Sequence, residues 1–251
     1  MTFARPATKA SQVILELSRH LQDDAPLSEL VLARYKRDLQ ASMQADASEA
    51  YAGLGMIAGI EWDENTMRQC FENAIRLDDE FTAHANYAVA LHRLGFVAEA
   101  AHQYRIAYDL APTDIEAALN AAMSTYIAGE LDLAVTLGKR LQNLSPGKIG
   151  FELATAEKIL RLFAKTSTDP DLMQRCNKVA FDVLREHRVR SKSVATEIDM
   201  EDQIVFTMIE VKASNAEIDR LDEILGSRLY NDVEDYDPHR YWVGYSFRSE
   251  L

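Results

Sequence analysis

The feature that most constrains the fold of this chain is a self-similarity with a period of 33 to 34 residues. The recurring positions are Gly95 and Gly129, Ala100 and Ala134, and Pro112 and Pro146. In the same way, Ala107 has its counterpart one period earlier at Ala74. Repetition at this period is typical of a chain built from one supersecondary unit that stacks on copies of itself.

Residues 81–112 show what the repeated unit is. Apolar and small side chains fall at helical spacing on both sides of Gly95, which predicts two helices joined by a turn. Glycine is favoured at such a helix end because the turn requires a positive φ, and Pro112 ends the second helix. Neither helix buries its apolar stripe alone, so successive hairpins must stack.

Over about residues 48–147 this pattern resembles the tetratricopeptide repeat family. The residues that carry the resemblance are Tyr51, Leu54, Gly55, Phe71, Ala74 and Asp79, then Tyr87, Ala88, Leu91, Gly95, Ala100, Tyr104, Ala107 and Pro112, then Ala121, Ala122, Gly129, Ala134, Leu141 and Pro146. The third unit departs from the family pattern, with Gly138 where a bulky aromatic residue is usual. The resemblance implies a solenoid of helical hairpins.

Weaker helical patterns flank the three repeats, at residues 11–22 and 27–43 before them and at 149–165 and 171–187 after them. We interpret these segments as capping or degenerate repeats, because the end repeats of a solenoid must turn a polar face outward. The solenoid domain is therefore expected over residues 1–193.

Residues 194–251 have a different pattern. VATEI (194–198) and IVFTMIEVKA (204–213) have strand composition, and RYWVGYSFR (240–248) is a third alternating segment. Between them Ser214 and Glu217 form a capping box that opens a helix. At 58 residues (194 to 251 inclusive) this unit is near the lower limit for independent folding. The predicted fold class is therefore mainly α, a solenoid followed by a small β-β-α-β unit that packs on the last solenoid helices.

The charge of the chain is uneven. The formal net charge is −13, and residues 194–251 hold 14 acidic against 5 basic side chains, a net of −9. Such a surface repels nucleic acid and attracts a basic protein partner, although the solubility of the chain would explain the same excess. No apolar segment approaches the ~20 residues of a membrane span. Cys70 and Cys176, without a CxxC motif, indicate reduced, buried thiols, so we expect a cytoplasmic protein with no membrane or nucleic-acid partner.

In the tetratricopeptide repeat family the first helix of each repeat lines a concave groove that takes extended peptides or helices. The matching positions here are Ala52, Met56 and Ile60, then Ala85, Val89, His92 and Arg93, then Leu119, Met123, Tyr126 and Ile127. This floor is apolar, and methionine adapts to varied side chains. Two alternatives stay open: the methionines belong to the core, or the groove is filled by the chain's own tail, for instance Tyr241–Phe247.

The expected function is therefore that of a non-enzymatic adaptor or chaperone-like protein. It would bind an apolar peptide or helix in the groove, and the acidic tail would recruit or screen a basic partner. No cofactor and no metal are expected, because the histidines His84, His92 and His102 lack the spacing of metal ligands. Solenoid edges often self-associate, so a homodimer is compatible with this interpretation.

An enzymatic alternative comes from the tail. Asp199, Glu210 and Lys212 are similar to the D…ExK residues of the PD-(D/E)xK nuclease superfamily. The resemblance implies that the two carboxylates hold Mg²⁺ and that the lysine polarises the attacking water. The same residues also suit an exposed strand edge, where lysine discourages aggregation.

Overall fold

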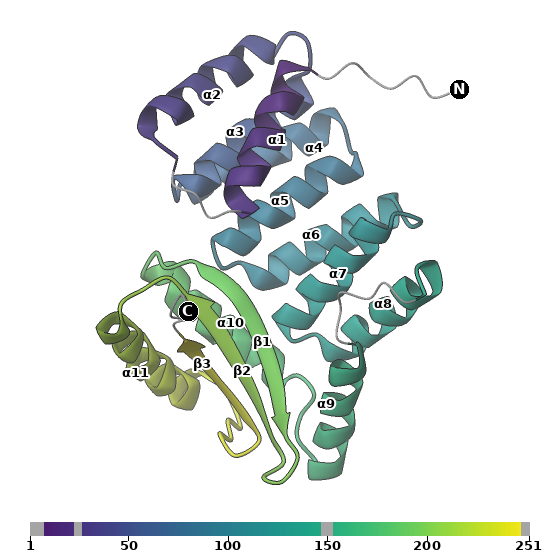
Figure 1. The fold of residues 1–251 in the computed structure, drawn as a ribbon, viewed down its shortest axis with the longest axis vertical. Helices are drawn as coiled ribbons and strands as arrows, with labels where there is room; N and C mark the ends of the chain where they lie inside the picture. The colour runs from purple at the N-terminus through teal and green to yellow at the C-terminus, as the bar shows by residue number, and fades with distance from the viewer. Residues whose placement is uncertain (1–7, 23–26, 147–152, 247–251) are drawn as a thin grey trace. The chain divides into compact units, whose positions relative to one another are not determined.

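The computed structural model of the chain describes residues 8–22, 27–146 and 153–246. These residues are mainly α-helical, with antiparallel helix pairs followed by a three-stranded mixed sheet and one further helix (Figure 1). The helices are α1 (Lys9–Gln22), α2 (Glu29–Ser42), α3 (Ala47–Ile60), α4 (Glu64–Leu77), α5 (Phe81–Arg93), α6 (Val97–Leu110), α7 (Ile115–Ala128), α8 (Leu131–Leu144), α9 (Leu153–Thr166), α10 (Leu172–Glu186) and α11 (Asn215–Asp232). The predicted flanking helices are confirmed as α1, α2, α9 and α10, with bounds within four residues of those expected.

The chain forms two compact units, Met1–Leu91 and His92–Leu251. The boundary expected from the sequence, between residues 193 and 194, is a different division and lies inside the second unit. Within the described residues, no helix is both long enough and apolar enough to cross a membrane.

In the first unit, the repeat residues make close contacts between helices. Gly55 on α3 lies under Phe71 of α4, so that a Cβ at this glycine would be only 2.7 Å from the aromatic ring. The Phe71 ring also contacts α5, because it stacks on Tyr87 with ring centroids 4.8 Å apart. The alternation of small and large residues in the repeat is therefore a matching of surfaces between neighbouring helices.

In the second unit, the two turns that the repeat pattern marked with glycine have the predicted conformation. Gly95 has φ +85° and Gly129 has φ +86°. Both glycines also lie against α10, because a Cβ at Gly95 would be 2.9 Å from the Phe181 carbonyl oxygen and one at Gly129 would be 2.5 Å from the Gln174 nitrogen. The glycines thus serve both the turn and the approach of a distant helix.

The strands are β1 (Ser191–Asp199), β2 (Ile204–Val211) and β3 (Tyr241–Ser246), in the order β1-β2-β3. β1 and β2 pair antiparallel through a short turn, and β2 and β3 pair parallel, as a connection through α11 permits. The predicted β-β-α-β unit is confirmed.

One face of the sheet is covered by α10 and α11. The buried side chains of this shared core are Met173, Cys176, Ala180 and Phe181 of α10, Ile218, Leu221, Leu225 and Leu229 of α11, Val205, Ile209 and Val211 of β2, and Tyr241, Val243 and Tyr245 of β3. The tail therefore packs on the last solenoid helix, as expected for a unit too small to bury a core alone. The two cysteines are free and buried, and burial raises the pKa of the Cys176 thiol to about 12.

Polar side chains connect α10 with the elements around it. Asn177 donates from Nδ2 to the Ile127 carbonyl oxygen (2.9 Å), and its Oδ1 accepts a hydrogen bond from the Tyr241 hydroxyl. This hydroxyl also lies 2.7 Å from Thr207 Oγ1 on β2. α7, α10, β2 and β3 are thus connected through a single buried amide.

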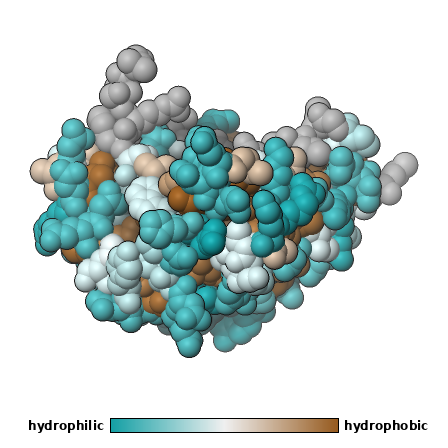
Figure 2. Space-filling model, turned by 90° about the horizontal axis from the view of Figure 1, so that it is seen from below, coloured by the Kyte–Doolittle hydropathy of each residue, from teal (hydrophilic) through white to brown (hydrophobic). Residues whose placement is uncertain are grey.

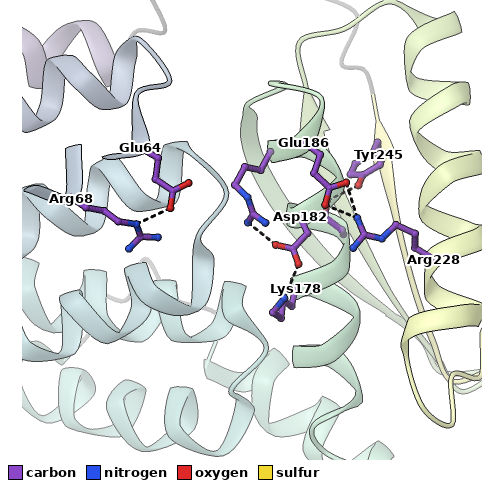
Figure 3. Close-up of polar contacts among 9 residues, drawn as sticks. Glu64, Arg68, Lys178, Asp182, Glu186, Arg228 and Tyr245 are labelled. Carbon is purple, nitrogen blue, oxygen red and sulfur yellow. Dashed lines mark hydrogen bonds and ion pairs between the residues drawn. The ribbon is translucent and has the colours of Figure 1, made fainter. Parts of the chain in front are cut away.

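A second set of polar contacts lies at the solvent side of the same junction (Figure 3). Arg228 of α11 donates to Glu186 of α10 at 2.9 Å, while Asp182 accepts from Lys178 at 2.7 Å and from Arg185 at 2.6 Å. The Lys178–Asp182 and Arg228–Glu186 pairs each have one exposed partner, so each contributes little to stability, and the buried contacts decide the packing.

The two environments of glycine in the second unit predict opposite effects of alanine. Gly129→Ala should lower the free energy of unfolding by at least about 2 kcal/mol, because its φ is left-handed and its Cβ would meet the backbone of α10. Gly226→Ala should raise it by about 0.5–1 kcal/mol, since Gly226 is inside α11 with nothing within 4 Å of its Cβ position. Urea denaturation of both variants measures the difference, and equal effects would contradict the packing of α10 on this turn.

The buried amide predicts an effect of the Tyr241 hydroxyl. Tyr241→Phe should destabilise the second unit by about 1–3 kcal/mol, because the variant leaves Asn177 and Thr207 without their shared partner. Tyr230→Phe is the matched control, since the Tyr230 side chain is 66% exposed and should show almost no change. Equal stability of the two variants in thermal unfolding would contradict the network.

Candidate functional site

A groove in the second unit is lined by residues of α7, α9 and the edge strand β1. Figure 1 shows how these three elements are arranged. Its volume is about 860 Å³. The residues that line it are Met123, Tyr126 and Ile127 of α7, Thr155 and Lys158 of α9, and Val194, Ala195, Thr196, Glu197, Ile198 and Met200 from β1 and the turn after it. We call this the β1 groove. Its volume is in the range of pockets that bind ligands or peptide side chains.

The floor of the β1 groove is apolar and partly open to solvent. Tyr126, Ile127, Val194 and Ile198 pack with one side against the core of the second unit. Met123 is 39% exposed and so offers its side chain to a partner. The charged groups that line the groove, Lys158 and Glu197, are exposed. The groove thus combines an apolar floor with a charged rim.

Exposed hydrophobic side chains by themselves do not mark this site. On the face shown in Figure 2, small hydrophobic patches alternate with hydrophilic residues, which is ordinary for a protein surface. The β1 groove is distinguished by its hollow shape and by the strand that forms one wall.

The helical wall is held in place by the ends of α7 and by α10. The carboxylate of Asp114 caps α7 by accepting from the Ala117 nitrogen at 2.8 Å, and Gly129 ends the helix. Near that end, Asn177 of α10 holds the Ile127 carbonyl oxygen. The side chains of the floor therefore extend from a helix with defined ends whose last turn is hydrogen-bonded to α10.

The strand wall presents unpaired backbone groups to the groove. Val205 donates its N–H to the Arg240 carbonyl oxygen at 3.1 Å, so its peptide groups point to β3 and those of Ile204, Phe206 and Met208 point to β1. In an antiparallel pair, opposite residues exchange both hydrogen bonds or neither. The register pairs Phe206 with Glu197, and Met208 with Ala195, so these β1 residues bond to β2.

The alternate β1 residues Val194, Thr196 and Ile198 consequently direct their N–H and C=O groups away from β2. In the described part of the chain β2 is the strand that pairs with β1, and no backbone hydrogen bond from another element reaches these groups. The Thr196 side chain is held from inside by Thr207, with their hydroxyl oxygens 3.1 Å apart. The wall is therefore an ordered strand with a free edge.

The structure divides the residues that the sequence proposed for one groove. Met123, Tyr126 and Ile127 lie together in the β1 groove, whereas Leu119 packs partly buried against the core between α7 and α8. His92 and Arg93 belong to the second unit but do not line the β1 groove. His92 lies against Phe181, with ring centroids 6.2 Å apart, and burial lowers the pKa of the imidazole to about 4, which leaves it neutral at pH 7.

The remaining proposed residues belong to the first unit. Ala52 and Ala85 line a smaller pocket of about 360 Å³, bordered by α1, while Ile60 and Val89 are half-buried elsewhere. Met56 is only 2% exposed and is part of the core, so its side chain is not offered to a partner. Two of the four carboxylates at this smaller pocket have structural roles, since Asp46 caps α3 and Glu49 accepts from Ser11 at 2.7 Å.

The structure does not bring the nuclease-like residues together. Asp199 pairs with Ile204, and Glu210 pairs with Ser193, so six positions of β2 or about 20 Å separate the two carboxylates. Asp199 accepts from the backbone nitrogens of the following turn, and Glu210 accepts from Ser193 at 2.6 Å. Lys212 is exposed. Among the described residues there is no cluster of three or more metal-ligating side chains.

β1 was not among the elements expected to form the groove. Tyr241–Phe247 was the tail segment expected as an alternative occupant of the groove, but Tyr241, Val243 and Tyr245 are buried in the core of the second unit, and Phe247 lies outside the described residues. The short alternating segment VATEI was the indication in the sequence that β1 could form such a wall, because its exposed residues imply that one edge or face of this strand remains uncovered.

No protein family model and no curated protein matches the chain.

Proposed function

We propose that this protein is a non-enzymatic interaction protein that binds an apolar segment of a partner protein in the β1 groove. The observation that carries the proposal is the convergence of Met123, Tyr126 and Ile127 with the β1 side chains around one hollow. No reacting group is needed for this role, since the groove offers apolar surface and backbone hydrogen-bonding groups.

We further propose that the helical hairpins are tetratricopeptide repeats. The support is the agreement of the repeat positions with their packing: Ala88 and Ala100 are fully buried, Phe71 stacks on Tyr87, and Gly129 has the positive φ of a hairpin turn. In this family the first helix of a repeat contributes the binding surface, which is the role that α7 has in the β1 groove.

The two methionines that line the groove suit a surface that adapts to its partner. Met123 is 39% exposed and Met200 is 68% exposed, and both are flexible side chains that can pack against varied apolar groups. Complete burial of one such side chain by a partner contributes about 1.5–3 kcal/mol, so a few contacts of this kind give a measurable affinity.

The charge of the tail favours a basic partner. Residues 194–251 have a net charge of −9, and Glu197 lies on the groove itself. Opposite charges accelerate association and select the partner, with a smaller effect on the final affinity. We therefore expect binding by this protein to become slower as the salt concentration rises.

Exchanging Met123 for a charged residue tests the proposed function. Met123→Glu should abolish capture of a partner from an extract of the native cells, because it places a carboxylate on the apolar floor. Leu133→Glu on α8 is the matched control, since Leu133 is 36% exposed but does not line the groove. The measurement is affinity capture with the full chain, because a truncation at residue 193 would remove part of the shared core.

Circular dichroism and thermal melting must show that both variants remain folded. Capture that survives in Met123→Glu would move the interface away from the groove and contradict the proposal. Loss of capture in both variants would indicate a general effect of surface charge and would contradict it as well.

A further inference from the structure

We infer that the partner segment binds as an added β-strand on the free edge of β1, and that it alternates apolar with basic residues. This inference rests on the proposed function and deepens it, because it specifies the conformation and the chemistry of the segment that the groove accepts. It differs from docking of a helix or an irregular apolar peptide, which would use the floor of the groove and leave the backbone of β1 unpaired.

The backbone of β1 is the first line of support. Val194, Thr196 and Ile198 direct their N–H and C=O groups away from β2 and toward the groove. A row of such groups at a sheet edge is a template for another strand, and main-chain hydrogen bonds then supply much of the binding. The β1–β2 ladder keeps these groups in register before a partner arrives, so little ordering of β1 is required.

The second line of support is the position along β1 of the features that protect a sheet edge. Sheet edges are usually protected against pairing by lysine, proline or a β-bulge. In β1 the irregularity lies between Ser191 and Ser193, and Lys192 is in the same place. The segment Val194–Ile198 that lines the groove has no lysine, no proline and no register shift. The unprotected part of the edge thus coincides with the groove.

The groove also matches the two faces of a strand. On the side covered by helices, the side chains of Val194 and Ile198 lie near Tyr126 and Ile127, so an added strand would direct every second side chain onto this apolar floor. On the other side of the sheet, Glu197 and Asp199 are the neighbours of an added strand. Opposite charges on adjacent strands are favourable, so the alternate residues should be basic.

The test uses a fluorescein-labelled synthetic peptide of alternating valine and lysine, titrated with the full chain and followed by fluorescence anisotropy. Two further peptides carry N-methyl groups, one on every valine and the other on every lysine. In a strand the N–H groups of alternate residues point to opposite sides, so only one of the two sets faces β1. A helix or an irregular peptide in the groove would not separate the two sets in this way.

We expect one methylated peptide to bind at least about tenfold more weakly than the parent and the other to stay within about twofold. Residues opposite each other on adjacent strands share a face, so valines lie opposite the outward-bonding residues of β1. In an antiparallel pair these opposite residues bond to each other, so weaker binding of the valine-methylated peptide indicates antiparallel addition. In a parallel pair the bonds go to the neighbours of the opposite residue, so weaker binding of the lysine-methylated peptide indicates parallel addition. Equal effects of the two sets, or no binding of the parent peptide at millimolar concentration, would overturn the inference.

A peptide of alternating valine and glutamate tests the charge. It should bind several-fold more weakly than the lysine peptide at low salt, and equal affinity would overturn the basic part of the inference.

Variants of the protein give an independent readout. Thr196→Pro removes an outward N–H from an edge strand that tolerates proline, and should weaken binding of the lysine peptide by about tenfold or more. Thr196→Val loses the same contact with Thr207 but keeps the outward N–H, so it should bind the lysine peptide at least about tenfold more tightly than Thr196→Pro. Equal binding by the two folded variants would overturn the inference.

The same assay separates this inference from the proposed function. If Met123→Glu weakens binding but the two methylated peptides behave alike, the groove binds its segment in another conformation, and only the inference fails. If the chain is a dimer in sedimentation and Thr196→Pro makes it a monomer, the edge belongs to a second copy, and this too overturns the inference.

Discussion

The packing of α10 between two helical turns and the sheet is the interaction on which the second unit depends. Its backbone approaches Gly95 and Gly129 so closely that neither position has room for a Cβ without movement of the helix. Asn177 of the same helix is hydrogen-bonded both to Ile127, near the Gly129 turn, and to Tyr241 of β3. Because one helix is in contact with both the hairpin turns and the strands, the distance between α7 and the sheet is determined, and with it the width of the β1 groove.

A groove with one helical and one strand wall can recognise a partner in two ways. The α7 side offers the adaptable apolar surface of Met123, and the strand side offers backbone groups at a regular spacing. Hydrogen bonds to the backbone of β1 would be indifferent to the partner's side chains, whereas the floor and the carboxylates of Glu197 and Asp199 would select among them. The proposed affinity and specificity thus come from different parts of the same site.

Several elements could be predicted because their signals are local. The positive φ of Gly95 and Gly129 follows from the end of a helical period, and the capping of α11 by Ser214 follows from a four-residue motif. Met56 shows the limit of this reasoning. Its helical position matched that of Met123, yet Met56 is buried and Met123 is exposed, because burial depends on which elements pack around each helix.

The sequence by itself determined the antiparallel helix pairs, the β-β-α-β order and the acidic charge of the tail, since each depends on composition or on periodicity over a few turns or strands. Only the tertiary structure decided where the site is. The β1–β2 register separated Asp199 from Glu210 and directed the backbone N–H and C=O of Thr196 away from β2. The contact of α10 with Ile127 and Tyr241 joined segments 50 and 64 residues away from Asn177. Such contacts depend on the complementarity of whole surfaces, and no local pattern in the chain records them.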